Sequence, residues 1–182
     1  MRVLIPAALL LATPLAFAAP ADLTQSRIGF AMKQLGTPVD GGFKSFSANV
    51  ELNPAKPETG KADITIQTGS ISLPTRDAEA EAKKKEWFNA GQFPTARFVS
   101  SSIKSAGPNR YQVTGKLTLK GITRDVSAPF TLKQQGALSV VEGVMPVSRL
   151  AFKIGEGDWT DTGTVADEVQ IKFHVAFPAT TK

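Results

Sequence analysis

The chain has 182 residues, of which 42% are hydrophobic, and a formal net charge of +5, an ordinary composition for a globular protein. It contains no cysteine and a single histidine, His174. This excludes disulfides, thiolate metal sites, cysteine nucleophiles, lipid modification of an N-terminal cysteine and metal centres with several histidines. The length suits one domain with a substantial core.

The first 18 residues are predicted to be a signal peptide. Arg2 precedes the apolar run Val3–Leu11, and the segment ends in the small-residue pattern Ala16-Phe17-Ala18. Two prolines interrupt it, and it is shorter than the ~20 apolar residues that cross a bilayer comfortably. We therefore expect cleavage after Ala18 and an exported, periplasmic domain over residues 19–182. The alternative is an uncleaved N-terminal anchor.

Three strands are expected between residues 27 and 67. Apolar and polar residues alternate over 27–33, 45–52 and 62–67, as in strands with one buried face. A stretch rich in proline and glycine, residues 53–60, separates the last two. The expected inward side chains include Ile28, Phe30, Met32, Phe46, Ile64 and Ile66.

A helix is predicted over residues 77–89. The residues between Ala78 and Glu86 are strong helix formers, and Thr75 suits the N-cap position. Gly91 and Pro94 follow the expected end. The large apolar residues Trp87 and Phe88 lie only at the C-terminal end, so we expect the helix to dock by that end and to leave the rest in water.

Strands dominate again after the helix. The clearest is 111–119, and the same alternation marks 126–132 and 169–177, and more weakly 98–103, 138–147 and 150–154. Residues 106–109 and 134–136 have the composition of hairpin loops. The expected inward side chains include Phe98, Val113, Leu117, Leu119, Phe130, Ile171, Phe173 and Val175.

About eight strands with one apolar face predict an all-β sandwich or barrel. A single domain can bury that face by closing an antiparallel sheet on itself. We therefore expect an eight-stranded antiparallel barrel with the helix near its mouth. The interior of such a barrel is either filled by side chains or holds one small ligand, and the alternation alone favours the filled interior.

No motif indicates catalysis, a metal site or a nucleic acid partner. His174 falls on the polar face of its strand, without a local nucleophile or carboxylate motif, and is expected to be a surface residue. The acidic loop 156–161 lacks the spacing of a calcium site, and no glycine-rich phosphate loop precedes a helix. Basic residues do not cluster with aromatic ones. The positive net charge is compatible with transient contact with an anionic membrane.

Several spaced motifs resemble those of one known family. They are Val39–Phe43 with Phe46, Ser70–Ser72 followed by Arg76-Asp77, Trp87–Asn89, Phe93–Ser100 and Val113–Arg124. Together they resemble the YceI-like family of bacterial periplasmic polyisoprenoid-binding proteins over residues 22–177. The chain departs from that family in lacking an opening Trp and Asp-x-x-His-Ser motif, and in a longer helix without the usual histidine.

The resemblance implies an extended lipocalin-like barrel without enzymatic activity, whose apolar pore holds a long isoprenoid chain, polyprenyl or quinone, for transport or storage. An anionic diphosphate head would need a cation, for which Arg76, Arg124 and Arg149 are candidates, with a surface or strand-pairing role as the favoured alternative for each. A quinone head would need no charge. The implied lipid-binding residues are Ile28, Phe30, Met32, Phe46, Ile64, Ile66, Trp87, Phe88, Phe98, Val113, Leu117, Leu119, Phe130, Ile171, Phe173 and Val175.

Two other interpretations stay open. A barrel filled by its own side chains would act as a structural or stress-response interaction protein, without lipid. An outer-membrane barrel would carry an apolar band facing the lipid. The sequence also leaves open whether the protein forms a homodimer.

Overall fold

The computed structural model describes residues 19–179, so the predicted signal peptide lies outside the described residues. Strands make up most of this region, with one α-helix, α1 (Arg76–Ala82), and four short 3-10 turns, η1 (Pro57–Thr59), η2 (Thr68–Ser70), η3 (Leu150–Phe152) and η4 (Gly157–Thr160). The strands are β1 (Ala19–Pro20), β2 (Asp22–Gln34), β3 (Thr37–Phe43), β4 (Phe46–Glu51), β5 (Lys61–Gln67), β6 (Ile71–Ser72), β7 (Thr95–Ser105), β8 (Arg110–Leu119), β9 (Ile122–Gln135), β10 (Leu138–Ser148) and β11 (Glu168–Pro178).

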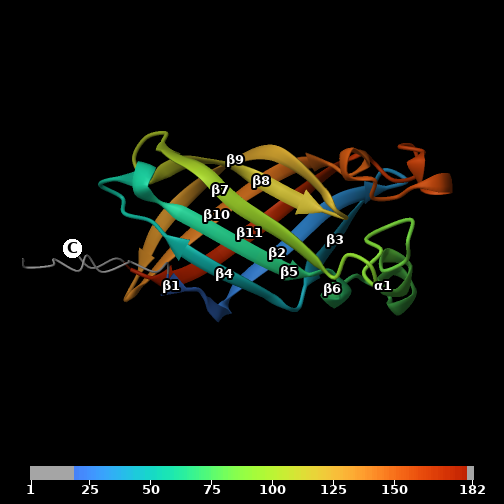
Figure 1. The fold of residues 1–182 in the computed structure, drawn as a ribbon, viewed down its shortest axis with the longest axis horizontal. Helices are drawn as coiled ribbons and strands as arrows, with labels where there is room; N and C mark the ends of the chain where they lie inside the picture. The colour runs from blue at the N-terminus through green and yellow to red at the C-terminus, as the bar shows by residue number, and fades with distance from the viewer. Residues whose placement is uncertain (1–18, 180–182) are drawn as a thin grey trace, which may run out of the picture.

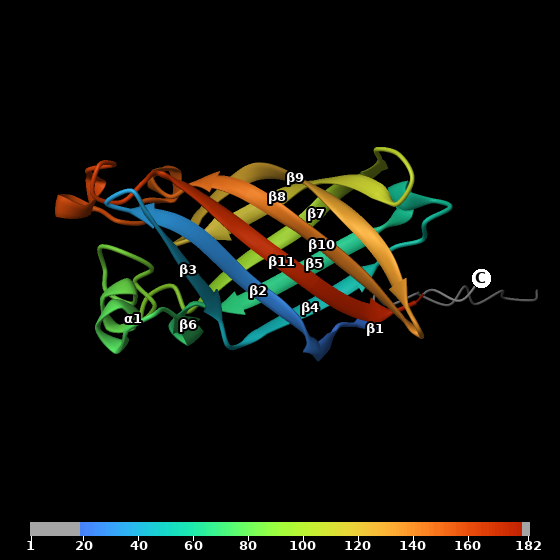
Figure 2. The same cartoon turned by 180° about the vertical axis from the view of Figure 1, so that it is seen from behind.

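Within residues 19–179, the eleven strands form one antiparallel sheet in the order β1-β4-β5-β7-β8-β9-β10-β11-β2-β3-β6. The sheet curls because its N-terminal segment joins two distant parts of this order. β1 pairs with β4, and the Ala21 N–H donates to the Ala48 carbonyl at 2.8 Å, while β2, which follows at once, pairs with β11 and β3. The result is an elongated barrel with α1 at one end (Figures 1 and 2).

The predicted all-β antiparallel barrel with one helix is confirmed, but the expected count of about eight strands is too low. β1 and β6 are only two residues long, and β3 was not predicted. β3 contains one proline and two glycines, which are poor strand formers. It forms nevertheless because a tight hairpin turn, with positive φ at Leu35 and Gly36, places it beside β2.

Helix α1 is shorter than the predicted 77–89. The predicted cap is confirmed, since the Thr75 hydroxyl accepts a hydrogen bond from the Ala78 N–H at 3.2 Å. The helix ends at Ala82 and gives way to turns in which the Phe88 N–H donates to the Ala82 carbonyl. Trp87 then packs on Trp159 and Phe88 on Phe43. These two aromatic contacts are made from the turns after α1 and not from a continued helix.

The predicted strand over residues 150–154 is wrong. The chain forms η3 there, followed by Lys153 with a φ of +56°. Phe152 and Ile154 are buried, as their alternation implied, but the backbone turns. The turn brings the carbonyls of Ile154 and Gly155 to the buried guanidinium of Arg149. A buried charge needs such partners, and this requirement overrides the strand pattern.

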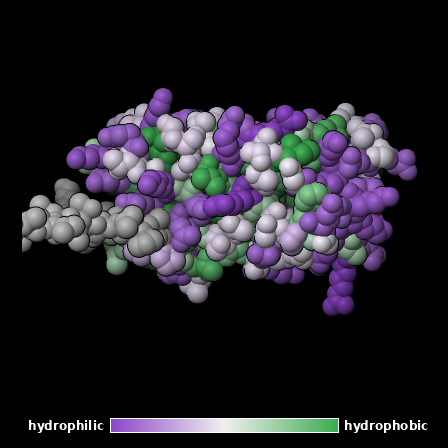
Figure 3. Space-filling model, viewed as in Figure 1, coloured by the Kyte–Doolittle hydropathy of each residue, from purple (hydrophilic) through white to green (hydrophobic). Residues whose placement is uncertain are grey.

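The apolar faces of the strands meet inside the barrel, and ion pairs join strands on the outside. Lys116 pairs with Asp125 and Lys133 with Glu142 on adjacent strands, and Lys172 of β11 reaches across β2 to Asp40 of β3. Hydrophilic side chains gather over the end of the barrel that carries α1 (Figure 3). No helix in residues 19–179 has the length and hydropathy that a membrane span requires.

Candidate functional site

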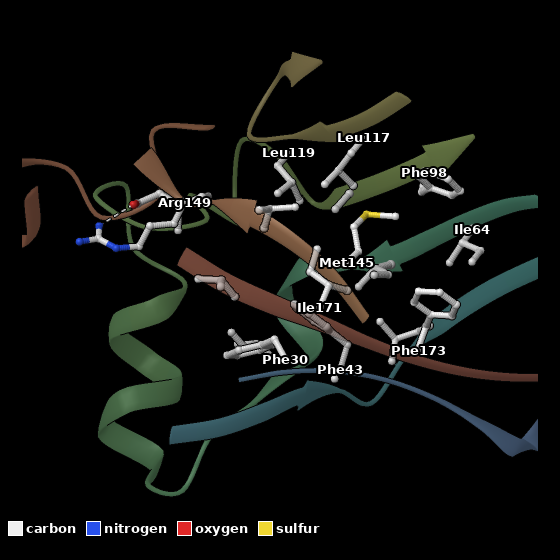
Figure 4. A pocket seen from close by; sticks show the side chains of 18 of the residues that line it. Phe30, Phe43, Ile64, Phe98, Leu117, Leu119, Met145, Arg149, Ile171 and Phe173 are labelled. Atoms are coloured by element: carbon white, nitrogen blue, oxygen red, sulfur yellow. Dashed lines mark hydrogen bonds between the residues drawn. The ribbon is translucent and has the colours of Figure 1, made fainter. Parts of the chain in front are cut away.

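The barrel interior contains a cavity of about 520 Å³, seen from close by in Figure 4. Its lining is almost entirely apolar and comes from inward-facing strand residues, from α1 and from the loop that follows β10. The size is typical of sites for small hydrophobic ligands. The strand alternation alone favours a barrel interior filled by side chains. That prediction is wrong, because the protein's own side chains leave this space open.

All of the residues predicted to bind lipid, except Phe46, line this cavity. They are Ile28, Phe30, Met32, Ile64, Ile66, Trp87, Phe88, Phe98, Val113, Leu117, Leu119, Phe130, Ile171, Phe173 and Val175. They come from seven separate segments of the described chain, which the closure of the sheet brings together. The cavity gives each of them a position in which it could touch a ligand.

Phe46 is the exception. It is the first residue of β4, pairs with Ile66 of β5 and packs against the core while remaining partly exposed. The cavity reaches β4 only further along, at Val50, and then Leu52 just beyond the strand. Alternation identifies the face of a strand that turns inward, but it does not say which part of the strand length the cavity occupies.

Two of the three predicted head-group residues lie away from the cavity. Arg76 is the exposed first residue of α1. Arg124 is exposed on β9, where its Nε donates to the Ala151 carbonyl at 2.7 Å. Neither belongs to the cavity lining, so neither is placed to meet a head group inside the barrel.

Arg149 does line the cavity and is 2% exposed, but its hydrogen-bonding capacity is already used. An arginine side chain has five N–H donors. Here Nε and the two terminal nitrogens donate to five backbone carbonyls at 2.7 to 3.2 Å. Those carbonyls belong to Ala166, Ile154, Gly155, Trp159 and Val165. Burial lowers the pKa of the guanidinium.

Lys120 stabilises the same end of the barrel through hydrogen bonds. Its side chain is 7% exposed, and its ammonium donates to the Lys85 carbonyl at 2.6 Å, to the Lys153 carbonyl at 2.8 Å and to Glu156. The bond from Lys120 lowers the pKa of Glu156. The amides of Gly155 and Glu156 both donate to the Glu86 carbonyl. The turn after α1, the loop after β10 and the β8–β9 hairpin are thus tied together around Trp87 and Trp159.

Several residues that line the cavity were not predicted to do so. Val50 and Leu52 follow the predicted alternation of their segment, and that signal alone could have identified them. Val141, Met145 and Val147 lie on β10, where Val140 is buried as well and obscures the alternation. Phe43 belongs to the unpredicted strand β3. Asp77 and Glu81 of α1 also contribute to the lining, and no pattern in the sequence indicates this.

The residues outside the cavity offer little chemistry. Nδ1 of His174 lies 2.9 Å from a carboxylate oxygen of Glu142 on the outer face of the sheet. Hydrogen bonds from His174 and Lys133 lower the pKa of Glu142. In the described part of the chain, no group of three or more histidine, aspartate and glutamate residues could hold a metal ion.

Comparison with known proteins places the chain in a family. The model of the YceI-like domain matches residues 20–177. The chain belongs to the YceI-like family. It is 29% identical over 115 residues to a UPF0312 protein of Pseudomonas syringae pv. syringae, covering 63% of this chain and 57% of the relative. A UPF0312 protein of Photorhabdus laumondii is 32% identical over 110 residues, 60% and 57% of the two chains. The YceI-like chain thus spans just over half the length of these relatives.

Solved structures give a similar result. Burkholderia cenocepacia BcnA is 46% identical, with a TM-score of 0.84, covering 88% of this chain and 99% of BcnA. A polyisoprenoid binding domain from Saccharophagus degradans is 13% identical with a TM-score of 0.72, covering 90% and 99%. A YCEI protein mutant from Campylobacter jejuni is 21% identical with a TM-score of 0.70, covering 78% and 85%. The last two likenesses concern the fold alone.

Proposed function

We propose that this YceI-like protein binds the hydrocarbon chain of an isoprenoid lipid inside its barrel and holds it away from water, without catalysis. The observation that carries the proposal is the apolar cavity of about 520 Å³, open within a barrel whose other inward residues pack as a core. Each buried CH₂ contributes about 0.8 kcal/mol. Roughly twenty buried carbons would therefore offset even an association cost of about 15 kcal/mol.

The head group that fits this cavity best is uncharged, as in a quinone or a polyprenyl alcohol. Arg97 borders the cavity from β7, but its exposed side chain points outward and pairs with Asp63, and Arg149 is saturated by backbone carbonyls. Asp77 and Glu81 also belong to the lining, and the carboxylate of Glu81 pairs with Lys84 at 2.6 Å, so α1 offers no free cation to a diphosphate in the cavity. An anionic head would therefore have to remain outside the cavity.

The proposal includes export to the periplasm, which the signal-like residues 1–18 support. A protein that encloses the lipid chain there could carry it across an aqueous compartment or store it. The structural neighbour from Saccharophagus degradans, described as a polyisoprenoid binding domain, supports this class of ligand through its shared fold. Transient contact with a membrane would load and unload the barrel.

The test is to identify what travels with the protein. The full chain is expressed in a Gram-negative host, purified from the periplasmic fraction without detergent, and examined by native mass spectrometry and organic extraction. We expect an intact mass that lacks residues 1–18 and a co-purifying isoprenoid at up to one molecule per chain. A protein that is reproducibly empty, and that also fails to take up added ubiquinone or geranylgeraniol, would refute the proposal.

A further inference from the structure

Three phenylalanine rings that line the cavity lie over inward-facing glycines on neighbouring strands. A Cβ atom built on each of these glycines would come within 3 Å of the ring. The space that a side chain would occupy is thus taken by the ring, which rests against the barrel wall (Figure 4 labels the three rings). The pairs are Phe30 over Gly41, Phe98 over Gly115, and Phe173 over Gly143.

The pair of Phe30 and Gly41 differs from the others in what surrounds the glycine. These two residues face each other directly across β2 and β3. A Cβ on Gly41 would lie 2.8 and 2.9 Å from the two Cε atoms of Phe30 and closer still to its Cζ, and these ring atoms are its three nearest neighbours. At Gly115 and Gly143 a Cβ would also strike a backbone oxygen. Of the three glycines, Gly41 is the one at which the three closest atoms all belong to the ring.

A displaced Phe30 ring has one direction open to it. The ring packs with Ile71, Ala82 and Phe88, and its centroid lies 5.7 Å from that of Phe43. These groups connect β2, β3, β6 and the end of α1 into a small buried cluster. The remaining side of the ring faces the cavity, which Phe30 lines. A side chain at position 41 would therefore push the ring into the cavity near α1.

We infer that Gly41 and Phe30 set the clearance of the cavity at its α1 end, and that this clearance admits methyl-branched chains. The inference rests on the proposed function. An isoprenoid carries a methyl branch on every fourth carbon of its main chain and is thicker than a straight acyl chain. A ring lying over a glycine leaves room for those branches. A ring pushed off the glycine leaves room only for the thinner chain.

The experiment compares two test ligands whose main chains have the same length, geranylgeraniol with methyl branches and 1-hexadecanol without them. Delipidated mature protein is titrated with each by calorimetry. Gly41→Ala should weaken geranylgeraniol binding by about tenfold or more, and hexadecanol binding by less than about threefold. Gly41→Ala combined with Phe30→Leu should restore geranylgeraniol binding to within about threefold of the original protein.

Gly42→Ala is the matched control. Gly42 is the next residue of β3 and faces the opposite side, where a Cβ would lie 3.3 Å from the Ile28 carbonyl oxygen and would not meet Phe30. Both ligands should bind this variant as they bind the original protein. Equal weakening of both ligands by Gly41→Ala, no weakening of either, or the same loss in Gly42→Ala would overturn the inference.

A second measurement applies if Gly41→Ala does not fold, as judged by its thermal melting. Phe30→Leu alone widens the same point, so the ratio of the two affinities should shift by about threefold or more toward geranylgeraniol. An unchanged ratio in this variant would equally overturn the inference. If the original protein binds neither ligand, the proposed function itself fails, and that outcome is distinct from each of these.

Discussion

The guanidinium carbon of Arg149 lies 5.7 Å from the ring centroid of Trp87, at one end of the cavity. The same guanidinium donates to five backbone carbonyls of the loop that follows β10. It thus contacts the turn after α1 through its face and the loop through its edges. A single side chain organises the two irregular segments that form this end of the barrel. Its role is structural, and the head-group role expected from the sequence would compete with these bonds.

We predict that Arg149→Met lowers the free energy of unfolding by about 3–5 kcal/mol, because buried carbonyls lose a charged donor. Urea unfolding followed by tryptophan fluorescence measures the change. Arg124→Met removes one bond from an exposed arginine and should change stability by less than about 1 kcal/mol. A loss of equal size in both variants would show that the carbonyl cluster has no special role.

The parts of the site that could be predicted from sequence are those that depend on strand alternation. The alternation alone predicts that Phe30, Leu117 and Phe173 lie on the inner face, because successive side chains of a strand point to opposite sides. The position of the cavity along each strand depends on how the sheet closes, which is why Phe46 packs against the core but lies outside the cavity lining. The hairpin partner β3 was missed because glycines weaken the strand signal.

The irregular end of the barrel could not be predicted for a different reason. Arginine is almost never fully buried, so no local pattern indicates that the side chain of Arg149 is enclosed by the carbonyls of a loop. The loop in turn takes its shape from this side chain. The prediction of a strand at residues 150–154 and the prediction of a head-group role for Arg149 are therefore wrong for the same reason. A long-range polar contact decided both, and local patterns carry no information about it.

Leu117→Trp is predicted to block the cavity without unfolding the barrel. Leu117 faces inward from β8, opposite Phe98 of β7, and both line the cavity. A larger apolar side chain can occupy the empty space, so the melting temperature should change by only a few degrees. Retention of co-purifying lipid, measured by native mass spectrometry, should fall by about tenfold or more.

Lys116→Trp is the control for that substitution. Lys116 is the neighbouring residue of β8, points outward and is paired with Asp125. The same bulk added outside the barrel should leave lipid retention unchanged. Normal lipid stoichiometry in a folded Leu117→Trp protein would show that the ligand does not occupy this part of the interior.

Lys120→Met tests the hydrogen bonds by which Lys120 stabilises the end of the barrel near Arg149. Its side chain is nearly buried and its ammonium is bonded to two carbonyls and one carboxylate, so we expect a loss of about 2 kcal/mol of unfolding free energy. Lys116→Met, which removes a lysine with a 63% exposed side chain, should lose less than about 1 kcal/mol in the same urea titration. If the two variants lose equal stability, the three contacts of Lys120 contribute no more than a surface ion pair.

The last prediction concerns acid and the outer face of the barrel. Arg97 donates two hydrogen bonds to the carboxylate of Asp63, at 2.9 and 2.6 Å, and these lower the pKa of Asp63 from its usual 3.8. A carboxyl whose pKa is lower in the folded state stabilises the fold above its unfolded pKa, and this contribution disappears as the pH falls through the folded value. Both side chains are more than a third exposed, so solvent screening limits the contribution to about 0.5 kcal/mol.

Asp63→Asn should therefore lower the free energy of unfolding by about 0.5 kcal/mol at neutral pH, and the difference from the original protein should vanish near about pH 2. Urea titrations of both proteins at the two pH values, each with and without added salt, measure this. Salt should reduce the difference at neutral pH, because the pair is exposed to solvent. A difference that persists unchanged in acid would assign the effect to altered packing of β5 on β7 instead of the charge of Asp63.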